Sequence, residues 1–417
     1  MSASHPLLSE IEVKLQWAGE GQGVRCAARR LAVLVTAVLL TQTTVVARLA
    51  ARVVALGLTE ASSAEGAARG LRRVLSDARL GGGQAYRRVL AATVEWQAYR
   101  RTHQPVVLIV DESSRGAHLH LLRVGLAYWG GSVPVAWALW EQNVPLPAGA
   151  YWGQLERVLA QARTVVPADL PVVVTADRAY DVPAFVDRVA AVGPGWHWVV
   201  RAKARGSVRY RTRQGQDIGL RQVVQRYLPR PGRRWKGRGA LWKGAGWREA
   251  SVVGMWAAHE REPVVVVTDL PARWEVLAHY DRRFWIECGF RSDKSHGWDW
   301  EESGVQGQEH HTVLVLALAW ATLITMSTGS TEVATRLARL RARPALTPQH
   351  GGGWWGRMIE HARHSVFTLG LCSLPRWMAP HPPTALPWHL PTPTTRSWND
   401  HWKQAQIIRN LNVPVRP

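Results

Sequence analysis

The order of short apolar runs in the middle of the chain most strongly constrains its fold. A run "PVVLIVDES" is followed by "LLRVGLAYW", a turn at Gly130–Ser132, the run "PVAWALWE", a helical stretch "YWGQLERVLAQAR" and a further run "PVVVTADR". Runs of this length and composition predict strands, and "YWGQLERVLAQAR" has the spacing of an amphipathic helix. We therefore expect an α/β fold with three strands in a meander, then a helix, a buried strand, a helix and another strand.

Two of these predicted strands stop on an aspartate, Asp111 and Asp177. A single aspartate at a strand end is usually a cap or a turn residue, and that interpretation remains open for each of them. Together with Glu287 on a later predicted helix, however, they supply three oxygen ligands of the kind that hard divalent cations prefer. Two such ions can activate a water or a 3′-hydroxyl and stabilise the leaving oxygen in phosphodiester transfer.

The segment "YDRRFWIECGFRSDK" places Tyr280, Arg283, Glu287 and Lys294 at offsets of zero, three, seven and fourteen. At about 100° per residue, a continuous helix would bring all four within an arc of roughly 60°. One face would then carry a single acid among groups that bind phosphate. The alternative is an ordinary solvated helix edge, with Arg283 and Glu287 as an i,i+4 pair.

The chain is strongly basic, with 52 Lys and Arg against 31 Asp and Glu in 417 residues, a net charge of +21. Such a surplus favours a polyanionic partner, foremost nucleic acid. Fifteen of the basic residues lie between Arg201 and Arg248, against one acid, Asp217. We expect DNA contacts from Arg233, Arg234, Lys236 and Arg238, although a solvated basic loop or a bias towards arginine codons would give the same composition. Arg178, next to Asp177, is a further candidate for a DNA contact, with pairing to a carboxylate as the alternative.

The three cysteines, Cys26, Cys288 and Cys372, show no paired spacing, which argues against a disulfide framework and a structural zinc site and indicates a reducing cytoplasm. The amino-terminal residues lack the basic start and apolar core of a signal peptide. The uncharged run Leu31–Ala47 is too short and too polar for a membrane span, so we expect a buried helix there.

Five regions follow from changes in composition and periodicity along the chain. We predict a helical amino-terminal DNA-binding domain over 1–100, the first part of an α/β core over 101–205 and a basic β-rich insertion over 206–262. The second part of the core, with the helix of Glu287, covers 263–330. Residues 331–417 form a carboxy-terminal helical segment and a Pro-rich tail, extended or strap-like around 380–395.

These features together resemble the DDE transposases of bacterial insertion sequences, in the branch with the Tyr-x2-Arg-x3-Glu-x6-Lys signature. Tyr280, Arg283, Glu287 and Lys294 match every spacing of that signature, and the segments around Asp111 and Asp177 are similar to those around the family's two aspartates. The similarity extends from about residue 60 to 370. It does not reach the first fifty residues or the Pro-rich tail.

The resemblance implies an RNase H-like core interrupted by a β-strand domain, with Asp111, Asp177 and Glu287 as catalytic and metal-binding residues for two Mg²⁺ ions, or Mn²⁺ as a substitute. It also implies that Tyr280, Arg283 and Lys294 contact DNA phosphates. The expected activity is cut-and-paste transposition on terminal inverted repeats and target DNA by a homodimer, through a hairpin intermediate, in the bacterial cytoplasm at the nucleoid.

Two rival interpretations remain at this point, and a third is argued against by the sequence. The chain could be an inactive DNA-binding relative, although its acids are intact, or a metal-dependent nuclease that cuts without joining strands. A haloacid-type phosphatase would need a second aspartate two residues after Asp111, where this chain has Ser113.

Overall fold

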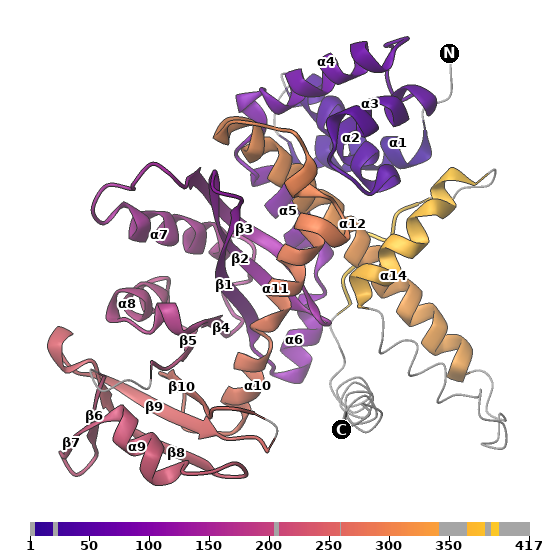
Figure 1. Cartoon of the computed structure of the whole chain (residues 1–417). Coiled ribbons are helices and arrows are strands. Elements are labelled where there is room, and N and C mark those ends of the chain that lie inside the picture. Colours follow the sequence, from indigo (N-terminus) through magenta and orange to yellow (C-terminus); the bar gives the residue numbers. More distant parts are fainter. Residues whose placement is uncertain are drawn as a thin grey trace, which may run out of the picture. The chain divides into compact units, whose positions relative to one another are not determined.

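The structure is a computed structural model that describes residues 5–19, 24–203, 208–258, 260–341, 365–379 and 385–391 (Figure 1). Its internal contacts divide the chain into two units. The first comprises residues 1–103, 128–134 and 289–417, and the second comprises 104–127 and 135–288.

The first unit is mainly helical within its described residues, apart from the ends of two strands in 128–134, and the spacing of the first hundred residues predicts these helices. Its helices are α1 (Pro6–Ala18), α2 (Val24–Thr41), α3 (Val46–Ala55), α4 (Ala64–Leu75), α5 (Gln84–Thr93), α6 (Trp96–Thr102), α12 (Gln308–Arg341) and α14 (Val366–Ser373). Helix α12 packs against α2, α4, α5 and α14. Its approach to α14 depends on two glycines, because a Cβ atom at Gly329 or Gly370 would overlap a backbone carbonyl of the other helix.

One helix among the described residues, Gln308–Thr335, is apolar and long enough to cross a membrane, but 94% of its most apolar window is buried inside the structure. The predicted buried helix in the run Leu31–Ala47 is confirmed as far as Thr41, where α2 ends. The chain then turns by 98° into α3, and the two helices would count as a membrane span only if this bent pair were taken as one. The 94% burial found in Gln308–Thr335 is typical of a core helix.

The second unit is built on most of a ten-stranded sheet with the strand order β3-β2-β1-β4-β5-β10-β9-β8-β6-β7. The strands are β1 (Val106–Arg115), β2 (Leu119–Tyr128), β3 (Gly131–Glu141), β4 (Val172–Ala176), β5 (Trp196–Arg201), β6 (Arg209–Thr212), β7 (Asp217–Gly219), β8 (Arg234–Leu241), β9 (Arg248–Met255) and β10 (Val264–Thr268). The pairs β1–β4 and β4–β5 are parallel and the other pairs are antiparallel. The expected α/β class is confirmed at this level.

The meander has a tighter turn than its sequence indicates. Strands β2 and β3 are joined through Trp129 and Gly130, which both have positive φ angles of 44° and 81°. Two such residues form the type of turn that fits the twist of a hairpin, and glycine adopts this conformation readily. The predicted turn at Gly130–Ser132 is therefore displaced by one residue, and Gly131 and Ser132 already belong to β3.

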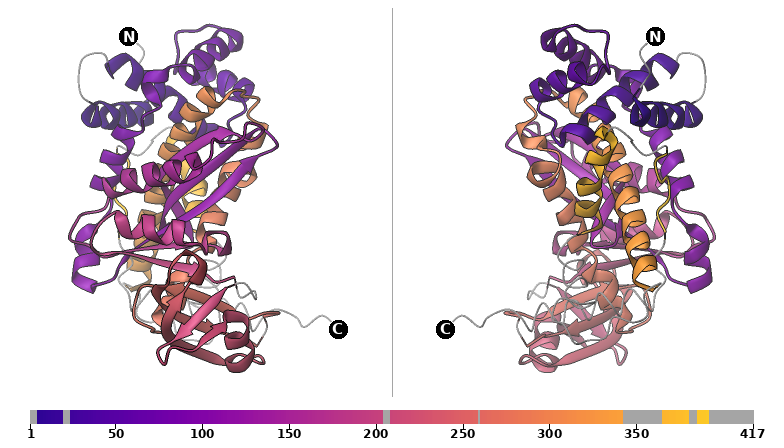
Figure 2. Two further views of the ribbon diagram at one scale, coloured as in Figure 1. Left: turned by 90° about the vertical axis from the view of Figure 1, so that its left-hand side faces the viewer. Right: turned by 90° about the vertical axis from the view of Figure 1, so that its right-hand side faces the viewer.

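Helices cover both faces of the sheet in the second unit (Figures 1 and 2). Helices α7 (Ala150–Arg163) and α8 (Pro183–Ala191) lie over one face of the β1–β5 region. Helix α10 (Glu275–Asp281) packs against β4, β5, β9 and β10 from the other face. The parallel strands between them are almost wholly buried, which accounts for their continuous apolar runs.

The region 206–262 contributes β6, β7, β8 and β9, with one helix, α9 (Leu220–Tyr227), among its described residues. Its strands pair onto β10, so they continue the central sheet. The boundaries of the five predicted regions stay predictions. The Pro-rich stretch 380–395 lies outside the described residues except for 385–391, where Leu390 forms a parallel bridge with Val94.

Candidate active site

The two aspartates lie in one row at the carboxyl edge of the parallel strands. The pairing of β1 with β4 ends at Val110 opposite Ala176, so Asp111 and Asp177 are the next residues on their two strands. Asp177 directly follows β4, as predicted. Asp111 does not end its strand, because β1 continues to Arg115 in pairing with β2. The predicted strand end at Asp111 is therefore wrong: Asp111 follows the last residue of the parallel pairing, and the strand itself ends at Arg115.

The same row contains a basic residue. Strand β5 pairs with β4 up to Val200 opposite Ala176, so Arg201 is the counterpart of Asp177. The row continues through Val266 of β10 and Val253 of β9 to Lys236 of β8. Side chains of one cross-strand row point to the same face of a sheet. Asp111, Asp177, Arg201 and Lys236 therefore share one face.

Arg283 joins two of the three predicted catalytic carboxylates. Its Nη1 atom lies 3.4 Å from Oδ2 of Asp111 and its Nη2 atom lies 2.5 Å from Oε1 of Glu287. The side chains of Arg283 and Asp111 are 10% and 16% exposed, whereas that of Glu287 is 44% exposed. The guanidinium thus forms a largely buried bridge from β1 to helix α11 (Phe284–Arg291).

Burial raises the pKa of Asp111 to about 6, although the amide of Glu112 and the charge of Arg283 act in the opposite direction. The negative charges of Asp177 and Glu287 raise the pKa of Asp111 further. Asp111 therefore lies close enough to both other acids to be affected by their charges. A site with this much negative charge and little water favours a cation.

The predicted continuous helix from Tyr280 to Lys294 is wrong. Helix α10 ends at Asp281, and Arg282 and Arg283 form a turn in which the amide of Arg283 donates to the carbonyl of Tyr280. Helix α11 then runs to Arg291 and is followed by a π-helical turn over Ser292–His296. The four residues of the signature consequently do not lie on one face of a single regular helix.

The break still leaves Tyr280, Arg283 and Glu287 near the aspartates. Tyr280 is buried, which raises the pKa of its hydroxyl; the charge of Asp177 raises that pKa further, and the charges of Arg283 and Arg201 oppose the shift. Lys294 lies in the first unit, where its Nζ atom is 3.4 Å from Oε1 of Glu301.

The sequence interpretation missed Glu112, which points to the opposite face from Asp111. Its Oε1 atom accepts hydrogen bonds from the hydroxyls of Tyr151 on α7 (2.5 Å) and Tyr180 (2.9 Å) in the turn after Asp177. Burial, with the nearby charge of Glu112, raises the pKa of both tyrosines. Glu112 therefore ties the segments that follow β1 and β4 to α7. The acid beside Asp111 was visible in the sequence, but its tyrosine partners were not.

The basic residues of β8 form an exposed stripe. Arg234, Lys236 and Arg238 alternate with inward-facing residues along the strand, and Arg233 precedes them at an exposed position. The cations of Arg234 and Lys236 lie 5.4 and 5.3 Å from the ring of Trp274, which precedes α10. The stripe therefore lies on the face of α10, which is also the face of the aspartates. At about 4.8 Å per strand, Lys236 is about 19 Å from Asp177 along the row.

Arg178, which follows Asp177, forms an ion pair of 2.5 Å with Glu262, and Glu262 also holds Arg201 at 2.5 Å. Arg178 was predicted to touch DNA or to pair with a carboxylate, and in the structure it pairs. Arg201 was noted only as part of the basic stretch; its place beside Asp177 depends on strand pairing that no local pattern reveals.

The donor set of the site fits hard divalent cations, since it consists of carboxylates: Asp111 and Asp177 at the edge of the parallel strands and Glu287 on α11. Within the described residues, no three His, Cys, Asp or Glu side chains converge closely enough to hold a metal ion as they stand. The bridge of Arg283 explains part of this arrangement, because its guanidinium lies between Asp111 and Glu287.

Comparison with known proteins supports a DDE transposase family. Residues 154–324 match the model of the transposase DDE domain, a range that contains Asp177, Glu287 and the signature residues but not Asp111. No curated protein sequence matches the chain. Among solved structures, the chain is similar to the cryo-EM structure of the piggyBac transposase synaptic complex with hairpin DNA, with 11% identity over 85% of this chain and 86% of that chain and a TM-score of 0.34.

Proposed function

We propose that the chain is a cut-and-paste DNA transposase of the bacterial insertion-sequence type, with an RNase H-like core that includes β1–β5 and a basic β-rich insertion. The observation that carries the proposal is the row of Asp111 and Asp177 at the edge of the parallel strands, with Glu287 joined to Asp111 through Arg283. The match of residues 154–324 to the transposase DDE domain supports it.

In this proposal Asp111, Asp177 and Glu287 would hold two divalent cations, Mg²⁺ or Mn²⁺, which when bound would activate a water or a 3′-hydroxyl and stabilise the leaving oxygen. Water attack at the end of the transposable element frees a 3′-hydroxyl. That hydroxyl then attacks the second strand, forming a hairpin, or attacks the target.

The protein's own cations position the DNA. The β8 stripe neutralises backbone phosphates about 19 Å from Asp177 on the same face of the sheet, so a duplex lying along that face would bring its backbone to the carboxylates. Arg283 holds the acids together before DNA arrives, and its planar fork also matches a phosphate. Tyr280 and Lys294 would add contacts to phosphates near the cleaved bond.

The full reaction involves two element ends, so we further propose a homodimer that holds both inverted repeats, in the bacterial cytoplasm at the nucleoid. The amino-terminal helices α1–α6 are the proposed binding region for the repeats. Their basic residues include Arg29 and Arg30 on α2 and Arg72 and Arg73 on α4.

The test uses the genomic sequence on either side of the coding region, searched for inverted repeats, and duplexes that carry those repeats. The purified protein with Mg²⁺ should nick the repeat end and join the new 3′-hydroxyl to a second DNA. Nicking without joining would indicate a nuclease, and binding without nicking would indicate an inactive relative; either outcome rejects the transposase.

A further inference from the structure

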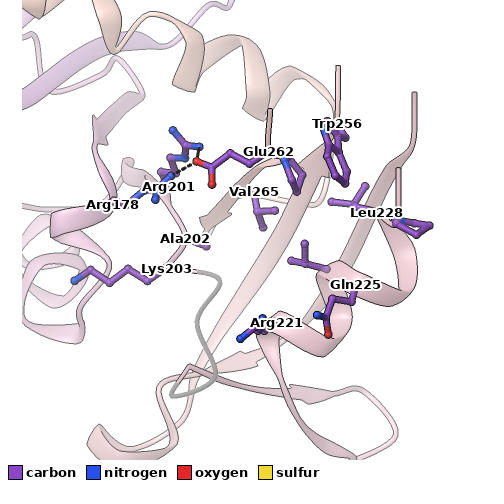
Figure 3. Close-up of a pocket in the computed structure, with 13 residues that line it drawn as sticks. Arg178, Arg201, Ala202, Lys203, Arg221, Gln225, Leu228, Trp256, Glu262 and Val265 are labelled. Carbon is purple, nitrogen blue, oxygen red and sulfur yellow. Dashed lines mark hydrogen bonds and ion pairs between the residues drawn. The ribbon is translucent and has the colours of Figure 1, made fainter. Parts of the chain in front are cut away.

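A pocket of 480 Å³ opens beside the row of aspartates in the second unit (Figure 3). Its walls come from the end of β5, from helix α9 and from the segment that leads into β10. Leu228 and Val265 give it an apolar side, and Trp256 stands at its rim. Its size is that of an ordinary ligand pocket.

The charged residues of this pocket are mostly basic. Arg178, Arg201, Lys203 and Arg221 line it, against one acid, Glu262. Arg178 follows Asp177 in sequence, and Arg201 is the neighbour of Asp177 across β4 and β5. Two residues of the pocket are therefore direct neighbours of Asp177, a proposed metal ligand, one along the chain and one on the adjacent strand.

Glu262 binds two of the four cations of the pocket. A single oxygen, Oε1, accepts hydrogen bonds of 2.5 Å from Nη2 of both Arg178 and Arg201. These two guanidiniums hold the pKa of Glu262 below its usual range. The side chain of Arg201 is 21% exposed whereas that of Glu262 is 58% exposed, so the carboxylate approaches the arginines from the solvent side.

The other two cations remain available to an incoming anion. The backbone amide of Lys203 donates to Oδ2 of Asp181 at 2.6 Å, and its ammonium donates to the carbonyl of Ala179 at 3.2 Å. The charge of Lys203 also lowers the pKa of Asp181, but no ion pair joins its ammonium to an acid among the described residues. Arg221 is exposed on α9 and pairs with no acid among the residues that the structure describes. Bringing four cations around one carboxylate leaves an excess of positive charge that a phosphate would balance.

We propose that this pocket binds a backbone phosphate of the DNA strand next to the cleaved bond, and that Glu262 fills the phosphate position until DNA displaces it. The proposal rests on the proposed function, because it takes DNA as the ligand. A phosphodiester offers the arginines two non-bridging oxygens that share its negative charge, in place of the one oxygen that Glu262 uses, and its sugar can pack on Leu228 and Val265. Glu262 then swings towards solvent, where it is already exposed.

The experiment measures binding of the full-length protein to a fluorescein-labelled 40-base-pair duplex of arbitrary sequence, in EDTA, by anisotropy between 50 and 300 mM KCl. Glu262→Gln should bind about five- to tenfold more tightly than wild type, because DNA no longer has to break two ion pairs. Lys203→Gln and Arg221→Gln should each flatten the slope of log K against log salt by up to about 0.9.

Matched controls separate this effect from a general change in charge. Glu156→Gln on α7 removes one exposed acid, and Arg157→Gln on α7 removes one exposed base, both away from the pocket. The gain from Glu262→Gln should also vanish in a protein that carries Arg178→Gln and Arg201→Gln. Thermal melting of every variant confirms that it is folded.

Two results would overturn the proposal: a gain from Glu262→Gln no larger than that from Glu156→Gln, or a gain that persists without the two arginines. If wild type nicks and joins repeat ends in Mg²⁺ while the pocket variants bind like wild type, the pocket assignment fails and the transposase stands. If wild type binds no DNA, both fail.

Discussion

The guanidinium of Arg283 lies 2.5 Å from the carboxylate of Glu287, four residues further along the chain and across the start of α11. Since the other arm of the same guanidinium reaches Asp111 on β1, the signature arginine holds two proposed metal ligands together in the absence of DNA. A residue expected from sequence to grip phosphate thus also has a structural role.

The first prediction concerns this bridge. Arg283→Ala should lower the free energy of unfolding by about 3 kcal/mol, because it leaves a largely buried Asp111 without its countercharge. Arg283→Lys should recover only part of the loss. Lysine restores the positive charge, but its single ammonium lacks the planar guanidinium that bonds to both acids at once. Urea unfolding at pH 8 measures both.

Assays of strand joining on repeat ends distinguish a catalytic role of Arg283 from its role in stability. We expect Arg283→Ala to lose about 2 to 4 kcal/mol of transition-state stabilisation at a temperature where it is folded, and Lys294→Ala to lose a similar amount without the loss of stability. Tyr280→Phe should be milder in joining. If Arg283→Ala joined strands like wild type, the guanidinium would be purely structural.

The second prediction concerns the β8 stripe. Replacing Arg233, Arg234, Lys236 and Arg238 with Gln should weaken binding to all DNA sequences and flatten the slope of log K against log salt by up to about three or four units. We expect this because the four basic side chains are exposed on the face of the sheet that carries the aspartates. An unchanged slope in anisotropy titrations would mean that the stripe faces solvent in the complex.

The third prediction concerns Glu112. Glu112→Ala should destabilise the protein by about 2 kcal/mol, because the buried hydroxyl of Tyr180 loses its acceptor and that of Tyr151 keeps only the hydroxyl of Tyr180 as an acceptor. Glu112→Gln keeps an acceptor oxygen and should cost less. Urea unfolding of the two variants tests this order, and equal stability of Glu112→Ala and wild type would refute the support that we assign to this acid.

The fourth prediction concerns pH. His197 on β5 forms a hydrogen bond of 2.9 Å with Asp269, which raises the pKa of the imidazole above its ordinary value of 6.5. Because the folded pKa is the higher one, the stabilisation is fully present below about pH 6.5 and is lost as the pH rises through the folded pKa.

Asp269→Asn should therefore be less stable than wild type by about 0.5 kcal/mol near pH 6, and the two should converge towards pH 9. The amide keeps an oxygen for the amide of Trp198, which Asp269 accepts in wild type at 3.0 Å, so this bond does not confound the comparison. A difference in stability that is constant from pH 6 to pH 9 would contradict the assignment.

Local patterns predicted the parts of the fold that depend on local chemistry. The apolar runs before Asp111 and Asp177 are buried parallel strands, and their register brings the two aspartates to one edge. The helical spacing of the first hundred residues is also confirmed. The strands and helices themselves could be predicted without information about distant residues, whereas the register of β1 and β4 is set by their pairing.

The remainder depends on contacts that sequence spacing does not encode. The break at Arg282 and Arg283 was not predictable, because arginine favours helices and no glycine or proline marks the turn. The position of Arg201 beside Asp177 arises from strand pairing, and its hold by Glu262 joins residues 61 positions apart. The roles of Asp111, Asp177 and Glu287 remain predictions.

Cleavage by carboxylate variants tests the central claim most directly. Asp111→Asn, Asp177→Asn and Glu287→Gln preserve side-chain size but remove the charge that a cation requires, and Glu156→Gln on α7 is the matched control. With duplexes that carry the element's repeats, in Mg²⁺, we predict that each of the three cuts at less than about 1% of the wild-type rate while binding the DNA nearly as well, because the phosphate contacts are untouched. The control should cut at the wild-type rate. Cleavage well above that level by any one of the three variants would contradict the assignment of these acids as the catalytic site.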